Sequence, residues 1–159
     1  MSPRQVAEYL HLLFAFVYVA ALMAAHWNTL AARRSASWAE RGVLFELNRR
    51  LSLVFSLPSL IGSGIVGNVL AMQLGYRMGE NRGLQIATGL WLVLLVLVLA
   101  IDVPISARLA TQSRAAAGAE NGGEPAGWSA SLSRLRLGNG LQLLVFVVLL
   151  WFMVTAWKP

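Results

Sequence analysis

Polar side chains that could bind or react are scarce in this chain of 159 residues, and those of interest lie within long apolar stretches. Counted from the ends of these stretches, four residues lie at a similar depth within them: His11, Asn68, Trp91 and Trp151. The sequence therefore predicts that His11, Asn68, Trp91 and Trp151 form one layer, a polar clasp between helices in which His11 is hydrogen-bonded to Asn68. The alternative is that the same four residues form a cofactor-binding layer. An imidazole can serve as an axial ligand to a haem or a chlorin, and indoles can supply flat walls.

Other kinds of reactive site find little support. The chain has no cysteine, which excludes disulfides, thiolate metal sites and cysteine nucleophiles. It contains no H-E-x-x-H motif, and no serine lies at the depth of both a histidine and a carboxylate. The second histidine, His26, is separated from His11 by about 22 Å of helix, so the two cannot share one metal. We expect no catalytic residues and no metal site, which weighs against an enzyme.

One carboxylate, Asp102, ends the third apolar stretch just before Pro104. We expect it to form one half of an ion pair near the membrane surface, because Arg49, Arg50 and Arg108 lie at a comparable depth. Asn139 and Gln142 lie at the same depth. A proton relay is the alternative, but no second carboxylate lies near it in the sequence.

The segment from Gly62 to Gly67 reads G-S-G-I-V-G and matches the dinucleotide-binding pattern G-x-G-x-x-G. That function needs a preceding strand, a following helix and a downstream acidic residue, and an apolar helix offers none of these. Small residues instead recur at every fourth position, which predicts a helix–helix contact face. A ligand groove is the alternative. The face consists of Ser59, Ser63, Gly67, Ala71 and Gly75. Pro58 predicts a bend in the same helix.

The elements that position these residues are predicted from hydropathy. The composition is 57% hydrophobic and 13% charged, with a mean hydropathy of +0.62. About 20 helical residues cross the hydrocarbon core, and backbone groups in lipid must be paired within the helix. The sequence therefore predicts a single domain over residues 1–159, an all-α integral membrane four-helix bundle. The expected spans cover residues 6–28, 50–75, 84–107 and 136–157, with a flexible loop at about 110–130.

The connections between the spans differ in charge. Ser37 and Glu40 fit a capping box, which predicts a short interfacial helix that runs on or bends into the second span. Nine of the 13 basic residues lie in the first and third connections: Arg33, Arg34, Arg41, Arg49, Arg50, Arg108, Arg114, Arg134 and Arg136. Basic loops stay cytoplasmic, so we expect both termini outside. Membrane topology then explains the net charge of +6 without nucleic acid as a partner.

Several short motifs resemble one family of small bacterial integral membrane proteins, domain of unknown function 2269. They are Tyr9-Leu10-His11-Leu12-Leu13 with Val17-Tyr18-Val19, Arg50-Leu51 with Leu57-Pro58, Pro104 with Arg108-Leu109, and Met153-Val154 with Lys158-Pro159. The resemblance implies a multi-pass protein of the bacterial inner (plasma) membrane. The family is distantly similar to HemJ-type protoporphyrinogen oxidases and copper-resistance D-type membrane proteins, and the HemJ likeness implies haem at His11.

Two classes of function stay open. The first is a non-catalytic accessory or assembly subunit that packs against other membrane protein subunits or a lipid-soluble cofactor. The second is a haem-binding membrane oxidoreductase of the HemJ type. The scarcity of acid–base groups and the lack of thiols and of a second axial histidine favour the first.

Overall fold

The computed structural model describes residues 1–77, 79–119 and 123–155, and within these residues the chain forms helices and no strand. In chain order the elements are α1 (Pro3–Arg34), α2 (Trp38–Leu51), the π-helical turn η1 (Ser52–Ser56), α3 (Leu57–Gln73), α4 (Arg82–Leu97), the π-helical turn η2 (Val98–Asp102), α5 (Val103–Ala117) and α6 (Trp128–Thr155). The π-helical turns join their neighbours into continuous helices, Trp38–Gln73 and Arg82–Ala117. The predicted four-helix membrane bundle is confirmed, because four helices are long and apolar enough to cross a bilayer.

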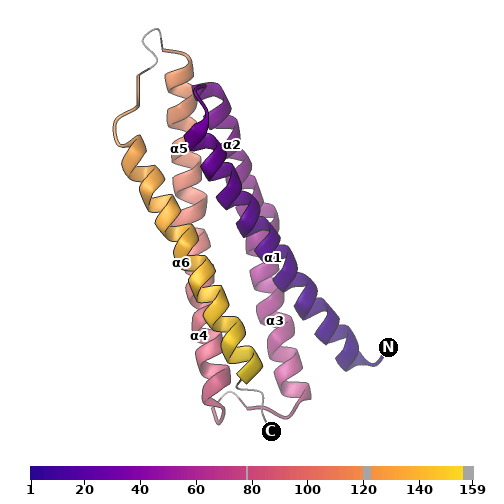
Figure 1. Ribbon diagram of the computed structural model, residues 1–159. Helices are drawn as coiled ribbons and strands as arrows, with labels where there is room; N and C mark the ends of the chain where they lie inside the picture. The colour runs from indigo at the N-terminus through magenta and orange to yellow at the C-terminus, as the bar shows by residue number, and fades with distance from the viewer. Residues whose placement is uncertain (78, 120–122, 156–159) are drawn as a thin grey trace.

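The four long helices run alongside one another (Figure 1). The N-terminus, the turn between α3 and α4 and the last turns of α6 lie at one end, here called the terminal end. The last turns of α1 and α5 and the first turns of α2 and α6 lie at the opposite end, here called the arginine end. Helix α1 packs against α2 and α3, α5 against α2 and α6, and α4 against α6. Residues far apart in the sequence therefore meet at matching heights.

Side-chain caps mark where several helices begin. The Ser2 hydroxyl accepts the Gln5 N–H while the Gln5 side chain accepts the Ser2 N–H, so α1 starts with a reciprocal capping box. The Ser37 hydroxyl accepts the Glu40 N–H, as the sequence predicts. The Glu40 carboxylate instead accepts a hydrogen bond from the Ser35 hydroxyl at 2.6 Å, and that hydroxyl accepts the Ser37 N–H. Glu40 therefore reaches the Ser37 N–H through the Ser35 hydroxyl and not directly, as the predicted capping box would have it.

Two prolines are accommodated by wide helical turns. Pro58 and Pro104 each follow a π-helical turn by two residues, and the N–H groups of Leu57 and Val103 bond the carbonyls of Ser52 and Val98, five residues back. A proline lacks the N–H that would bond the fourth residue back, and a wider turn absorbs the mismatch without ending the helix. The predicted interfacial helix therefore continues into the second span as α2, η1 and α3.

The helices are longer than the predicted spans. Helix α5 continues to Ala117, through the first part of the predicted flexible loop at 110–130, and α6 already begins at Trp128. Residues 120–122 of that loop lie outside the described residues, as do Trp157 at the end of the fourth span and Lys158. Each 36-residue helix is about 54 Å long, whereas the hydrocarbon core is about 30 Å thick.

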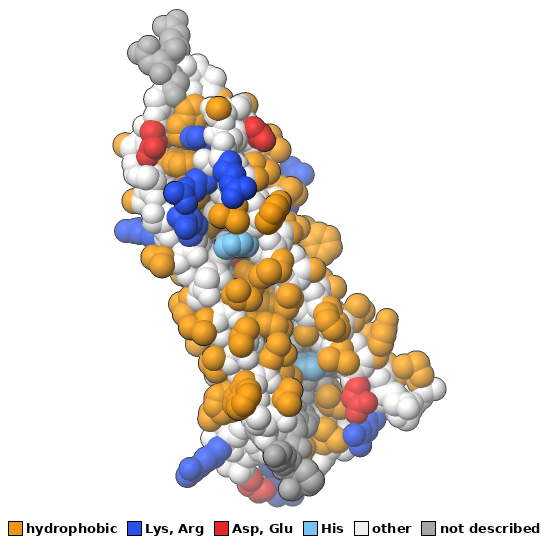
Figure 2. Space-filling model, in the orientation of Figure 1, with side chains coloured by type: hydrophobic (Ala, Val, Ile, Leu, Met, Phe, Trp, Pro, Cys, Tyr) orange, Lys and Arg blue, Asp and Glu red, His pale blue; other side chains and the backbone are white. Residues whose placement is uncertain are grey.

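The surface and the core both vary along the bundle. Figure 2 shows Lys and Arg side chains gathered toward the upper, arginine end, while hydrophobic side chains cover the middle and lower parts of the visible face. Inside, the terminal cluster consists of Tyr18, Leu22, Leu60, Leu94, Val98, Val145, Phe146 and Leu149. The arginine-end cluster consists of Ala32, Phe45, Leu109, Ala110, Trp128, Leu132 and Leu135. Between them along the helices lie buried polar residues, here called the polar layer: Asn48, Ser52, Asp102, Ser106, Asn139 and Gln142.

Candidate functional site

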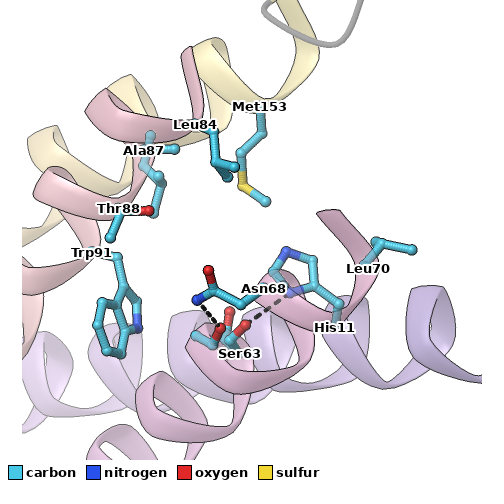
Figure 3. Close-up of a pocket in the computed structure, with 12 residues that line it drawn as sticks. His11, Ser63, Asn68, Leu70, Leu84, Ala87, Thr88, Trp91 and Met153 are labelled. Atoms are coloured by element: carbon cyan, nitrogen blue, oxygen red, sulfur yellow. Dashed lines mark hydrogen bonds between the residues drawn. The ribbon is translucent and has the colours of Figure 1, made fainter. Parts of the chain in front are cut away.

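A small pocket lies between α1, α3, α4 and α6 in the terminal half of the bundle (Figure 3). It encloses about 70 Å³ and is open on one side. His11 of α1, Asn68 of α3, Trp91 of α4 and Met153 of α6 all line it, so the structure brings together three of the four residues predicted to form one layer. We call this site the His11 pocket.

The position of His11 fixes which of its ring nitrogens carries the hydrogen. Its Nδ1 lies 3.1 Å from the carbonyl oxygen of Ser63. A carbonyl oxygen can only accept a hydrogen bond, so Nδ1 is the donor and Nε2 of the neutral ring holds the lone pair. In Figure 3 the second ring nitrogen of His11 points away from the α3 backbone. The pocket therefore presents the unshared electron pair of an imidazole.

The predicted hydrogen bond between His11 and Asn68 does not form. The Asn68 carboxamide Nδ2 donates to the carbonyl oxygen of Gly64 at 2.8 Å. Gly64 lies one helical turn before Asn68, so the short side chain reaches a carbonyl of its own helix more easily than a ring on α1. Its carboxamide oxygen faces the pocket in Figure 3.

Trp91 forms one wall and is anchored in the same way. Its indole Nε1 donates to the carbonyl oxygen of Leu60 at 2.7 Å. A Cβ atom placed on Gly64 would lie 2.5 Å from Cε2 of the indole, so the ring occupies space that only glycine leaves free.

The other two glycines of the G-x-G-x-x-G segment also make room for rings. A Cβ atom on Gly62 would lie 2.7 Å from Cζ of Phe14, and one on Gly67 would lie 3.0 Å from Cε1 of His11. Each glycine thus lets an aromatic ring from a neighbouring helix approach the α3 backbone closely. These glycines serve packing between helices.

The predicted small face is shorter than the sequence suggests. Ser59 and Ala71 are buried, and Gly67 contacts His11 of α1. Gly75 lies beyond the end of α3 in a left-handed conformation with φ of 77°, and a Cβ atom there would have no neighbour within 4 Å. Gly75 is therefore a turn residue, because the helix ends before the four-residue repeat does.

Trp151 does not belong to the His11 pocket, which corrects the predicted layer. It is 67% exposed, whereas Leu149 and Met153 on the same helix line the pocket. Residues four apart share a face of a helix, so the residue midway between them projects to the other side. Leu149 and Met153 are the pocket residues on α6 that sequence reasoning missed, and nothing in their apolar surroundings distinguishes them.

A second polar feature was also missed. The Tyr18 hydroxyl donates to Oε1 of Gln142 at 3.1 Å, and Nε2 of Gln142 donates to both carboxylate oxygens of Asp102 at 2.9 Å each. The exposed fractions of these three side chains are 1%, 0% and 5%. The network joins α1, α6 and η2 across the centre of the bundle. The depths of Gln142 and Asp102 in the sequence hinted at their meeting, but Tyr18 gave no signal.

Asp102 does not form the predicted ion pair in the part of the chain that the structure describes. Arg49 and Arg50, which were expected beside it, bond Glu46 instead at 2.8 and 3.2 Å, and Arg114 lies 3.4 Å from the same carboxylate. Arg49 and Arg50 reach Glu46 because they follow it by three and four residues on the same helix.

The polar layer also holds groups with no hydrogen-bond partner among the described residues. These are the Ser106 hydroxyl and both polar atoms of the Asn139 carboxamide, all fully buried. Ser106 follows Asp102 by one turn, and Asn139 precedes Gln142 by about one turn on the antiparallel α6. An unpaired buried polar group costs about 1–3 kcal/mol.

Within the described ranges no three His, Asp or Glu side chains gather as a metal site would require. Four apolar helices with interior polar groups define a multi-pass membrane protein. Neither a protein-family model, nor a curated protein, nor a solved structure matches the chain.

Proposed function

We propose that this chain is a non-catalytic accessory or assembly subunit, which packs against a larger membrane complex or holds a lipid-soluble cofactor. The His11 pocket is the observation that carries the proposal. Four helices meet there around an open space, and His11 is the only ionisable residue among the described side chains that line it. General acid–base catalysis requires a positioned proton donor or acceptor matched to a reacting group, and a lone imidazole with fixed tautomer suits binding better.

The apolar exterior supports the same proposal. Phe16, Val54, Ile65, Val147 and Val154 are each more than half exposed. Such side chains suit contact with lipid tails or with other membrane-spanning helices, and the surface offers both kinds of partner ample area.

Purification from native membranes in mild detergent tests the proposal. An affinity-tagged chain should elute in a complex larger than its own 17.3 kDa or with a bound small molecule. Native mass spectrometry identifies either one. Elution of the chain alone, without any bound molecule, across several mild detergents would contradict the proposal.

We further propose membership of the family called domain of unknown function 2269 and a location in the bacterial inner membrane, with both termini outside. The resemblance of short motifs and the crowding of arginines at one end support this placement. Cysteines introduced in place of Ser2 and Thr111, both exposed, test the orientation with an impermeant thiol reagent on intact cells. Labelling at 111 without labelling at 2 would reverse it.

The haem alternative is favoured by one observation and opposed by another. Metal-binding histidines usually donate their second ring N–H to a carbonyl or carboxylate, as His11 does to Ser63. The enclosed 70 Å³ is too small for the macrocycle, since it is less than half the volume of an engineered cavity of about 150 Å³ that binds the much smaller benzene. A haem does not fit inside the pocket as it stands. A Soret band that disappears in His11→Ala would nevertheless establish this alternative.

A further inference from the structure

We infer that the His11 pocket recognises a membrane-soluble alcohol or phenol through its hydroxyl group, which donates a hydrogen bond to Nε2 of His11. This inference rests on the proposed function, since it names the chemical class of the small molecule that the subunit would hold. Most hydrogen-bond donors around the pocket are already used within the protein, whereas acceptors are left facing the open space.

The donors around the pocket are largely occupied. His11 donates to the Ser63 carbonyl at 3.1 Å, Asn68 to the Gly64 carbonyl at 2.8 Å and Trp91 to the Leu60 carbonyl at 2.7 Å. All three acceptors belong to the backbone of α3. One helix therefore orients a ring from α1, a carboxamide of its own and a ring from α4.

The groups left for a ligand are mainly acceptors. Nε2 of His11 carries a lone pair, and the carboxamide oxygen of Asn68 faces the pocket (Figure 3). Thr88 adds a hydroxyl, which can donate or accept. A ligand hydroxyl complements this set, because it can donate a hydrogen bond to the imidazole. A quinone or ketone oxygen only accepts, and a carboxylate adds negative charge, so neither can bond Nε2.

The size and walls of the pocket limit how much of the ligand enters. The remaining lining is largely apolar and includes Leu84, Leu149 and Met153. A narrower cavity of about 20 Å³ continues on the Tyr18 side of His11 and Trp91. The enclosed space of about 70 Å³ holds a hydroxyl group and part of one ring or chain, and the remainder of the ligand stays outside the open side.

A pair of probes that differ only in the donated hydrogen tests the inference. The full-length protein in detergent is titrated with 4-octylphenol and with its methyl ether, 4-octylanisole, which share the ring and alkyl chain but differ in donor capacity, and binding is compared at equal concentrations within the micelles. Thermal shift reports binding, and ¹⁵N NMR of labelled histidine reports the environment of Nε2. The phenol should bind at least tenfold more tightly than the ether and should shift the Nε2 resonance.

Two variants complete the test. His11→Leu should remove the preference for the phenol, whereas His26→Leu, which alters an exposed histidine outside the pocket, should retain it. Because His11→Leu can also lower stability, His11→Phe provides a second ring-bearing variant without an acceptor. Equal binding of phenol and ether, or no binding of either, would overturn the inference. If a partner protein nevertheless co-purifies, the proposed function stands without the inference. If neither a partner nor a bound molecule co-purifies, both the inference and the proposed function fail.

Discussion

The His11 pocket and the polar layer at Asp102 use polar side chains in opposite ways. Around the pocket, His11 and Asn68 each bond a backbone carbonyl of α3 and keep a second polar atom toward open space. At the polar layer, Gln142 bonds both Asp102 and Tyr18, so buried side chains from three helices are joined and leave no open side. The first region can therefore exchange partners, whereas the second fixes the height of α1, α6 and the Arg82–Ala117 helix relative to each other.

This difference follows from what an unpaired group costs in each place. A half-buried imidazole nitrogen can meet a ligand or water, so its lone pair is tolerated. A buried carboxylate in the bundle centre must be paired, because an isolated charge there costs several kcal/mol. Side-chain bonds across helices are thus expected to dominate stability, and side-chain bonds to backbone around the pocket are expected to dominate binding.

The largest effect is expected from Gln142→Leu. The change removes the groups that bond Tyr18 and both oxygens of Asp102, and a buried polar group left without its partner costs about 1–3 kcal/mol, more when it is charged. Thermal unfolding in detergent should show a large drop in melting temperature. The double variant Gln142→Leu with Asp102→Leu should recover most of it, and a double variant less stable than Gln142→Leu would show that Asp102 is stabilised by other groups.

A smaller loss is expected from Gly64→Ala. The added methyl group would collide with the Trp91 indole, and overpacking costs about 1–3 kcal/mol. Gly89→Ala is the matched control, because a Cβ atom at that helical position has no neighbour within 4 Å. The control should leave the melting temperature unchanged or raise it slightly. Equal effects of the two changes would mean that the indole does not rest on α3.

His11→Leu should lower stability by about 1 kcal/mol, since it removes one hydrogen bond of ordinary strength to a carbonyl that belongs to a helix. Leu12→Ala, at a position 57% exposed, should change the melting temperature less in the same detergent. If His11→Leu proves as costly as Gln142→Leu, the contrast between a binding region and a structural region fails.

The smallest effect has the opposite sign. Asn139→Leu removes two buried polar atoms that have no partner among the described residues, and it should raise the free energy of unfolding by about 0.5–1 kcal/mol. Differential scanning calorimetry in detergent can detect a change of this size. A clear loss of stability would instead indicate that Asn139 bonds an ordered water molecule inside the polar layer.

Depth in the bundle could be predicted from the sequence. Counting from the ends of the apolar stretches placed His11, Asn68 and Trp91 in one layer, and the structure brings them to one pocket. The same count placed Asp102 level with Gln142, and the two are hydrogen-bonded. Helical rise is constant, so distance along the sequence converts directly to height.

The direction in which side chains project could not be predicted. In lipid an apolar residue is tolerated on every side of a helix, so the apolar pattern of α6 does not distinguish Trp151, which faces outward, from Met153, which lines the pocket. The sequence also did not show which of several possible hydrogen-bond or ion-pair partners each polar side chain would choose. Asn68 bonds its own helix, and Glu46 takes arginines that were expected near Asp102, because short-range geometry prevails over matching depth.

The extra length of the two 36-residue helices implies that the two ends of the bundle pack in different solvents, one in water and the other in lipid. About 24 Å of each helix extends beyond the hydrocarbon, and this overhang includes Phe45 and Leu109 of the arginine-end cluster. Water drives that cluster together, whereas lipid tails give the terminal cluster no such push. Urea dissolves in water and not in hydrocarbon, so it should melt the arginine end while four apolar helices remain in the bilayer.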